Sequence, residues 1–335
     1  MTEKQLILSV SPHIKSEETT ARIMWSVSAS LLPAVLMGAY YFGSAAVITV
    51  ALCLASSVLA EYLYLRGMKK QNTIVDGSAF LTGLLLGLNL PPSVPFYIPV
   101  VGSFTAVIIT KQLFGGLGYN IFNPALIGRA FLLISFPKLM TVWNAPVPVF
   151  MKIDALTTAT PLGILKEEGE SRLIELFGDK VHLYMQLLFG NHAGCIGETS
   201  GIALLIGAAF LFYRKYITWH IPLSFIGTAA AIAWIFGGRE GLFTGDPLLH
   251  ILSGGMVLGA FFMATDYVTS PSVKNGQILF GIGCGFLTML IRLKGGYPEG
   301  VMFSILIMNA FAPLIDRGFK SKIFGMQKKP GGSKH

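Results

Sequence analysis

Charged residues are scarce in this chain. Asp, Glu, Lys and Arg make up 13% of its 335 residues, whereas an average soluble domain has about a quarter. Hydrophobic residues make up 53%, and the mean hydropathy is +0.64. Only three cysteines occur, and Cys53 and Cys284 lie inside apolar blocks. These features exclude a water-soluble globule and a disulfide-built secreted scaffold, and the long apolar blocks predict an all-α polytopic membrane protein.

Positive charge exceeds negative charge, giving a formal net charge of +8. The basic residues are scattered along the edges of polar segments and in the tail, so we do not expect nucleic-acid binding. Residues 1–20 are polar and mixed in charge, without an apolar core or a small-residue cleavage site. We therefore expect no cleaved signal peptide, and the first spanning helix would direct the chain into the lipid bilayer.

Apolar blocks between breaker residues predict ten transmembrane helices. The predicted helices are 21–42, 45–65, 77–90, 95–114, 122–136, 196–213, 218–236, 248–264, 277–293 and 300–315. Blocks 77–90 and 122–136 are shorter than the roughly 20 residues that cross the hydrocarbon core, so we expect short or broken helices there. The chain then divides into an N-terminal segment (1–20), a first unit of five helices (21–136), a loop (137–195), a second unit of five helices (196–315) and a basic tail (316–335).

The distribution of basic residues predicts the orientation in the membrane. With the N-terminus in the cytoplasm, most Lys and Arg residues fall in cytoplasmic segments, among them Lys69, Lys70, Arg214 and the tail. This is the arrangement that the positive-inside rule describes. Both termini are then cytoplasmic, and the loop 137–195 lies on the outer face.

An internal repeat relates the two units. Residues 111–134 and 291–314 are identical at seven positions with a constant offset of 180, including the Gly-Gly pairs that begin at Gly115 and Gly295. Because each unit has an odd number of helices, the second unit is inverted relative to the first. Such folds place binding sites at the interface between the repeats. The sequence therefore predicts two inverted five-helix repeats.

Several acidic residues stand where an ion could bind. Intramembrane charge is costly and usually functional, so Glu61 is a candidate ion or proton ligand, although its position near a helix end also suits a snorkelling side chain. Asp266, Glu299 and Asp316 lie at helix ends, where they could hold a cation or simply cap the helix. No iron–sulfur motif is present, because three cysteines are too few and too widely spaced.

The outer loop contains the string Asp-Ala-Leu-Thr-Thr-Ala-Thr-Pro-Leu at residues 154–162. From its chemistry alone, a hydroxyl-rich stretch before proline is better explained as a capped turn than as a modification site. Asn120 and Asn123, beside Pro124, likewise fit an asparagine-capped helix that begins with proline. The residues alone therefore favour structural roles for both motifs.

The string at 154–162 resembles the flavinylation motif of the membrane subunits shared by the Rnf complex and the sodium-pumping NADH:quinone reductase. Other blocks resemble the same family over nearly the whole chain. They are Ser11-Pro12-His13, Asp76-Gly77 leading to Leu90-Pro91-Pro92, Gly118–Ala125, Gly194–Ser200, Ala264-Thr265-Asp266 and Gly295–Gly300. The short segment before Ser11 is more similar to D subunits of the Rnf complex than to B subunits of the reductase. Thr158 departs from the glycine that the family often has there.

The resemblance implies cofactors that the residues alone do not. A separate flavin transferase would esterify FMN through its phosphate onto Thr160, and a non-covalent riboflavin would lie near Asn120 and Asn123. Cys195, Glu198, Thr199 and Ser200, where the loop re-enters the membrane, are candidates for the FMN surroundings, with a capped helix start as the alternative.

The resemblance also implies a function. The chain would be one membrane component of a ferredoxin:NAD⁺ oxidoreductase in the cytoplasmic membrane of a prokaryote, inactive without the other Rnf subunits and coupled to translocation of Na⁺ or H⁺. Two alternatives stay open at this point. One is the B subunit of the Na⁺-translocating NADH:quinone reductase, and the other is a small-solute channel or secondary transporter, since inverted five-helix repeats describe such proteins too.

Overall fold

The structure, a computed structural model, describes residues 18–146, 158–238 and 241–319. The Ser11–His13 block, Asp154 and Thr157 of the threonine motif, and the tail from residue 320 lie outside these ranges. Every regular element of more than one residue in the described ranges is a helix, which confirms the all-α class.

Most helices of the first unit follow the predicted blocks within a few residues, but the block 21–42 is divided at Leu31 between the first two helices. The helices are α1 (Thr20–Ser30), α2 (Leu32–Gly67), η1 (Ile74–Asp76), α3 (Ser78–Leu88), α4 (Tyr97–Phe104), the π-helix η2 (Thr105–Gln112) and α5 (Pro124–Ser135). The one-turn helix α6 (Pro137–Met140) follows at the start of the loop 137–195. The boundary predicted between 42 and 45 is a kink inside α2. It lies at Gly43, whose φ of +63° is in the region that glycine adopts without a steric penalty.

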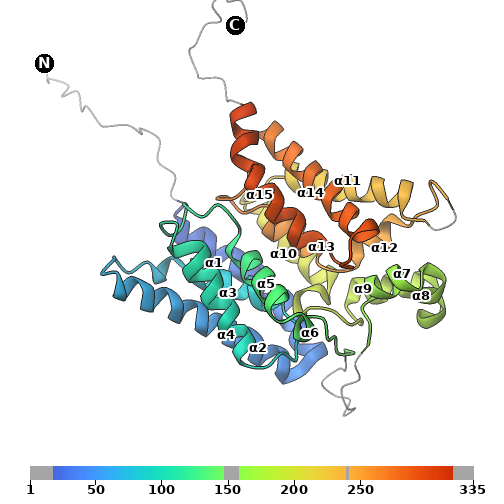
Figure 1. Cartoon of the computed structure of the whole chain (residues 1–335), viewed down its shortest axis with the longest axis horizontal. Coiled ribbons are helices and arrows are strands. Elements are labelled where there is room, and N and C mark those ends of the chain that lie inside the picture. The colour runs from blue at the N-terminus through green and yellow to red at the C-terminus, as the bar shows by residue number, and fades with distance from the viewer. Residues whose placement is uncertain (1–17, 147–157, 239–240, 320–335) are drawn as a thin grey trace, which may run out of the picture.

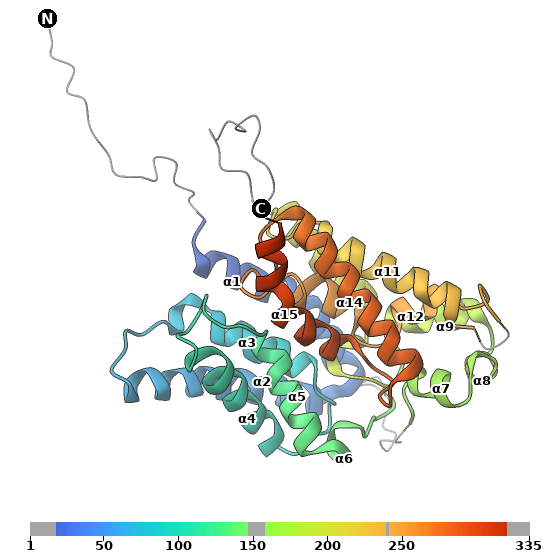
Figure 2. The same cartoon turned by 45° about the horizontal axis from the view of Figure 1, so that its top comes forward.

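The described part of the loop 137–195 is more ordered than its sequence predicts, because three further helices follow the short helix α6. These are α7 (Pro161–Glu167), α8 (Glu170–Phe177) and α9 (Lys180–Phe189), followed by η3 (Ile196–Glu198). Leu173, Leu183 and Leu187 are buried together with Leu249 of the second unit, in a hydrophobic cluster separate from the main core. The loop is therefore packed onto the second unit, and Figures 1 and 2 show α7–α9 grouped beside α12.

Helices of the second unit also match the predicted blocks, with one interruption. They are α10 (Gly201–Tyr213), α11 (His220–Phe236), α12 (Pro247–Leu252), α13 (Met256–Leu258), the π-helix η4 (Gly259–Met263), α14 (Lys274–Lys294) and α15 (Val301–Gly318). The helix predicted over 248–264 breaks after Leu252, because Ser253 is extended and Gly254 has a φ of +68°.

Three helical segments in the described ranges are long and apolar enough to cross a membrane: Thr20–Gly67, Lys274–Lys294 and Val301–Gly318. Shorter apolar helices accompany them at α3, α5, α10 and α11. The short helices at α3 and α5 agree with the prediction for blocks 77–90 and 122–136. The architecture is that of a helical membrane protein in which short apolar helices accompany the long ones.

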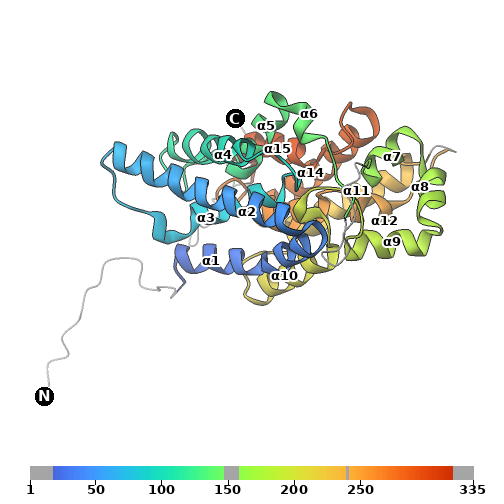
Figure 3. The same cartoon turned by 90° about the horizontal axis from the view of Figure 1, so that it is seen from below.

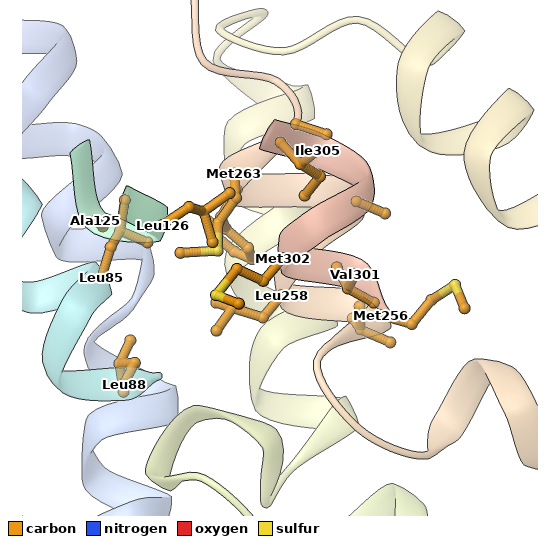
Figure 4. Packing of buried hydrophobic residues seen from close by; sticks show 14 of the residues in the cluster. Leu85, Leu88, Ala125, Leu126, Met256, Leu258, Met263, Val301, Met302 and Ile305 are labelled. Atoms are coloured by element: carbon orange, nitrogen blue, oxygen red, sulfur yellow. The ribbon is translucent and has the colours of Figure 1, made fainter. Parts of the chain in front are cut away.

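The two units lie side by side and meet along a shared core. Figure 1 shows the first unit in blue to green on one side of the molecule and the second in yellow to red on the other. Helix α1 contacts α10, as Figure 3 also shows, and α5 contacts α15. Each pair joins equivalent helices of the two units, which is consistent with a two-fold axis between the units. The inverted repeat itself stays a prediction. Figure 4 shows Leu85 and Leu126 of the first unit facing Met263 and Met302 of the second.

The connecting segments gather at two ends of the molecule. At one end, Asn120, Tyr216 and Asp266 line a common pocket. At the other, Ile196 N donates to Leu90 O. The first group consists of segments predicted to be cytoplasmic and the second of segments predicted to be on the outer face. The grouping fits an alternating path through the membrane, and the orientation itself stays a prediction.

Close packing of α1 against α10 depends on Gly207. A Cβ at this position would lie 2.1 Å from Ser30 O, a backbone atom that cannot move aside. We expect Gly207→Ala to destabilise the purified protein by about 1–3 kcal/mol, the usual cost of overpacking, measured as a lower thermal unfolding midpoint in detergent. Gly227→Ala in α11 is the matched control, because nothing lies within 4 Å of its Cβ position. An equal loss in both variants would contradict this account.

Candidate functional site

Thr160 is the N-cap residue of α7. Its Oγ1 accepts a hydrogen bond from Gly163 N at 3.1 Å, and Pro161 occupies the first helical position, where its missing N–H costs nothing. The side chain is half-buried. The capped turn is thus present. Since Oγ1 acts as the acceptor in this bond, an ester at the same oxygen would replace its hydrogen and not the N–H of Gly163.

A cavity of about 930 Å³ begins two residues beyond Thr160. Leu162, Leu165 and Lys166 of α7 form one wall, and residues of α8, α11, α12 and α14 form the others. This volume is near the upper end of the roughly 300–1,000 Å³ typical of ligand pockets. Its lining combines aromatic rings, such as Phe286, with cationic groups, such as Arg292, so the cavity suits a flat ligand that has polar edges.

Tyr184 of α9 holds one polar wall of this cavity in place. Its hydroxyl donates to Asp246 Oδ2, and Asp246 also caps α12 by accepting from Leu249 N at 3.2 Å. Burial, followed by the hydrogen bond to Asp246, raises the pKa of Tyr184. The phenol therefore stays protonated and keeps donating, which holds α9 against the start of α12.

Arg129 of α5 is the centre of a buried polar cluster between the two units. Its Nη2 lies 2.5 Å from Glu299 Oε2 and 3.8 Å from Glu198 Oε1. The same nitrogen is 3.3 Å from Cys195 Sγ, while Nη1 donates to Asn89 Oδ1 at 2.9 Å. Arg129 comes from α5, and its partners come from η3 and the residue before it, the end of α3 and the turn before α15, so the cluster connects both units to the re-entering loop.

Arg292 of α14 lies next to this cluster. Its guanidinium donates to the carbonyl oxygens of His250 and Ser253, which the break between α12 and α13 exposes. A Cβ at Gly254 would lie 2.6 Å from Leu162 Cδ1, 3.3 Å from Arg292 Nη2 and 3.8 Å from Glu299 Cγ. The segment that carries Thr160 is therefore packed directly over the buried polar cluster.

The three polar residues at the loop's re-entry have different roles. Ser200 caps α10 by accepting from Ala203 N at 3.2 Å, and Thr199 Oγ1 donates to Ile196 O at 2.9 Å. Both interactions are local, as the capped-start alternative predicts. Glu198, in contrast, faces Arg129. None of the three lines the cavity beside α7, so their assignment to the FMN surroundings stays a prediction.

Asn120 and Asn123 line one pocket at the opposite end of the molecule, together with Lys111 and Asp266. The side chain of Asn123 already makes several hydrogen bonds. It caps α5 through Ala125 N and Leu126 N and donates to Met263 O at 3.3 Å. Asn120 donates to Phe122 O at 3.1 Å. The pocket has a volume of about 80 Å³, which is small for a ligand site.

Glu61 does not snorkel to the surface, because its side chain is fully buried. Lys111 Nζ donates to its Oε1 and Oε2 at 3.0 and 2.9 Å. Gln112 Nε2 and Thr73 Oγ1 donate to Oε1 at 2.8 and 3.0 Å. The carboxylate is thus held by four hydrogen bonds from three residues. Its role as an ion ligand stays a prediction, and any ion would have to displace one of these donors.

The other acidic candidates also accept hydrogen bonds from the protein. Asp266 accepts from Thr269 Oγ1 at 3.1 Å, and Asp316 accepts from Ser272 N at 3.0 Å. Glu299 accepts from Gly255 N at 2.9 Å in addition to Arg129. Within the described ranges, no group of three or more His, Cys, Asp or Glu side chains is arranged to hold a metal ion.

Sequence reasoning missed Lys111, Arg129 and Arg292 as site residues. All three are buried, and a signal for them was present, because basic side chains inside predicted spans are as costly as acidic ones. The sequence could not show their partners. Lys111 is 50 residues from Glu61, and Arg129 is 170 residues from Glu299.

The sequence is similar to known proteins over almost its whole length. Residues 7–325 match the model of the NQR2, RnfD, RnfE family. The chain is 51% identical over 321 residues, 96% of each chain, to the D subunit of the proton-translocating ferredoxin:NAD(+) oxidoreductase complex of Clostridium ljungdahlii. It is 47% identical over 331 residues, 98% of each chain, to the D subunit of the Na(+)-translocating ferredoxin:NAD(+) oxidoreductase complex of Acetobacterium woodii. Over 327 residues, 91% of this chain and 92% of the relative, it is 40% identical to the D subunit of the ion-translocating oxidoreductase complex of Stutzerimonas stutzeri. With matches of this extent, the chain belongs to the NQR2, RnfD, RnfE family.

Proposed function

We propose that this chain is the D subunit of an ion-translocating ferredoxin:NAD⁺ oxidoreductase of the Rnf type. The observation that carries the proposal is the similarity over 96–98% of the chain to two subunits of that name. The helical membrane fold supports it. As one component of a complex, the chain would act together with the other Rnf subunits and not alone, in the cytoplasmic membrane of a prokaryote.

We further propose that Thr160 carries FMN as a phosphoester, formed by a flavin transferase. Its hydroxyl is half-buried, it caps α7, and a cavity large enough for an aromatic ring system begins beside it. Bound FMN would supply one- and two-electron redox chemistry. The chain's part is to fix position and surroundings. Thr160 anchors the phosphate, Leu162 and Phe286 offer apolar walls, and Lys166 and Arg292 offer positive charge to a ring that becomes more negative on reduction.

Riboflavin at Asn120 and Asn123 is also part of the proposal, with a weaker fit. The amides offer the right donors and acceptors, but Asn123 is committed to the α5 cap, and a pocket of about 80 Å³ must widen to admit three fused rings. Asn120 is therefore the better candidate of the two.

The translocated ion is Na⁺ or H⁺ in this proposal. The names of the two relatives differ on this point, one being proton-translocating and the other Na(+)-translocating, and their identities to the chain are similar. Glu61, Asp266, Glu299 and Asp316 remain ion-pathway candidates. All four carboxyl groups already have donors, so an ion must compete with a hydrogen bond at each of them.

A direct experiment tests the flavin part of the proposal. The chain is expressed with and without the flavin transferase, purified, denatured and examined on a gel under ultraviolet light. We expect a fluorescent band only with the transferase, and a peptide containing Thr160 that is heavier by one FMN ester. A colourless chain from cells with the transferase would contradict covalent flavinylation and favour the channel or transporter alternative.

A second assay separates the two redox alternatives. The purified complex is supplied either with reduced ferredoxin and NAD⁺ or with NADH and a quinone. We expect NAD⁺ reduction by ferredoxin in the first mixture. Quinone reduction without ferredoxin activity would instead assign the chain to the sodium-pumping reductase.

A further inference from the structure

Glu198 and Glu299 form a carboxyl pair at the junction of the two units. Glu198 belongs to η3 and is 7% exposed, and Glu299 lies in the turn before α15 with its side chain 19% exposed. A Cβ added at Gly255 would lie 2.7 Å from Glu299 Oε1 and 3.3 Å from Glu198 Oε1. The two carboxyl groups thus face the same point, and both also approach Arg129 Nη2, with Glu299 Oε2 at 2.5 Å and Glu198 Oε1 at 3.8 Å.

A hydrogen bond between two carboxyl groups needs a proton on one of them, because ionised carboxylates only accept. The hydrogen-bond donors around the pair lie mainly next to Glu299 and not next to Glu198. Glu299 accepts from Arg129 and from Gly255 N, so its ionised form is well supported. Glu198 Oε1 is buried and has no hydrogen-bond donor in the described part of the chain. An ionised Glu198 would therefore be a buried, poorly solvated charge beside a second carboxylate.

The other charged and titratable groups around the pair do not replace a shared proton as a partner for Glu198. Arg129 can neutralise one carboxylate and already lies 2.5 Å from Glu299. Arg292 brings a second positive charge, but its guanidinium donates to the carbonyls of His250 and Ser253. Cys195 Sγ faces Arg129, and the ring of His192 lies near Glu198 across Gly194. None of these contacts supplies a donor to Glu198 Oε1.

We propose that Glu198 and Glu299 share one proton, held against Arg129, and so form a buried proton-binding site between the two units. The occupant is a proton and not a metal cation, because the guanidinium stands where a cation would have to approach Glu299. After loss of the proton, both carboxylates would face the guanidinium of Arg129, which is already paired with Glu299. Binding of the proton therefore changes the net charge of the cluster that joins α5, η3 and the turn before α15. This change would alter the relative stability of different arrangements of the two units.

Infrared spectroscopy of the purified chain tests the proposal directly. A protonated carboxylic acid has a carbonyl stretching band separate from the ionised carboxylate bands, and this band shifts in D₂O. We expect the wild-type protein at neutral pH to show such a band, and both Glu198→Gln and Glu299→Gln to lose it. In each variant the single remaining carboxyl group faces Arg129 alone and ionises.

The loss in both variants is the decisive result, because an independently protonated Glu198 would keep its band in Glu299→Gln. Asp316→Asn is the control and should leave the band unchanged, since Asp316 accepts from Ser272 N outside the pair. A band that survives either Gln variant overturns the proposal. So does the absence of any protonated carboxyl band from the wild-type protein, a measurement that needs no variant to fold. The readout does not involve flavin, so it is independent of the proposed function.

Discussion

The Thr160→Ala chain, coexpressed with the flavin transferase, is expected to carry no FMN through denaturation. The reason is chemical, because alanine has no oxygen on which a phosphoester can form. Flavin fluorescence of the denatured band should fall to background, and the mass increase on the Thr160 peptide should vanish. Turnover of the complex with ferredoxin and NAD⁺ should fall with it, since one electron carrier is missing.

Thr160 also caps α7, so a loss of flavin could follow from a damaged helix instead of a missing anchor. Replacing a threonine N-cap by alanine costs about 1 kcal/mol, and here the bond lost is the one from Gly163 N. Two variants separate the causes. Thr160→Asn keeps a good cap without an esterifiable hydroxyl, and we expect it to fold normally and lack flavin. Thr160→Ser keeps both, and we expect it to retain flavin.

Thr158→Ala is the control for position within the motif. Thr158 is exposed and its backbone N–H, not its side chain, donates to Trp143 O. We expect this variant to retain its flavin. Flavin that persists on Thr160→Ala, or that moves to a different residue, would contradict the assignment of Thr160 and would leave the cavity beside α7 without its proposed occupant.

The predictable part of the fold is the part that lipid and helix geometry determine. Apolar blocks such as 277–293 and 300–315 became α14 and α15 with ends shifted by one to three residues, because a span must be continuous and apolar. The short third and fifth blocks became short helices for the same reason. The break inside 248–264 was not predicted. It depends on Gly254 adopting a positive φ so that backbone carbonyls can reach Arg292, and apolar composition does not reveal that.

Helices α7–α9 were missed because the loop that contains them is not apolar enough to be read as spans. Their fold depends on burying Leu173 and Leu187 against Leu249, a contact across more than 60 residues. Within the candidate site, the helix caps were predictable. The caps at Asn123 and Ser200 follow from residue type and position. The ion pairs were not, because a buried Glu61 or Arg129 indicates that a partner exists without showing where it lies in the sequence.

The buried pair of Glu61 and Lys111 leads to the second large expected effect. We expect Lys111→Met to destabilise the protein by about 3–5 kcal/mol, because it leaves an uncompensated charge on Glu61 at a fully buried position. The thermal unfolding midpoint in detergent should fall sharply, and folded protein in the membrane should decrease. Arg172→Met is the matched control. Arg172 pairs with Glu168 and Glu175 on the exposed surface, where such pairs contribute about 0–1 kcal/mol.

The double variant Glu61→Gln/Lys111→Met distinguishes a structural role of the pair from a role in ion translocation. Removing both charges also removes the desolvation cost, so most of the lost stability should return, and the coupling energy of the cycle isolates the pair. If stability returns while ion-coupled turnover does not, then Glu61 or Lys111 acts on the ion beyond holding α2 against η2. If both return, the pair is structural, and Glu61 is no longer an ion-pathway candidate. A double variant no more stable than Lys111→Met would refute the pairing, because the destabilisation would then come from lost packing of the lysine stem rather than from the stranded carboxylate.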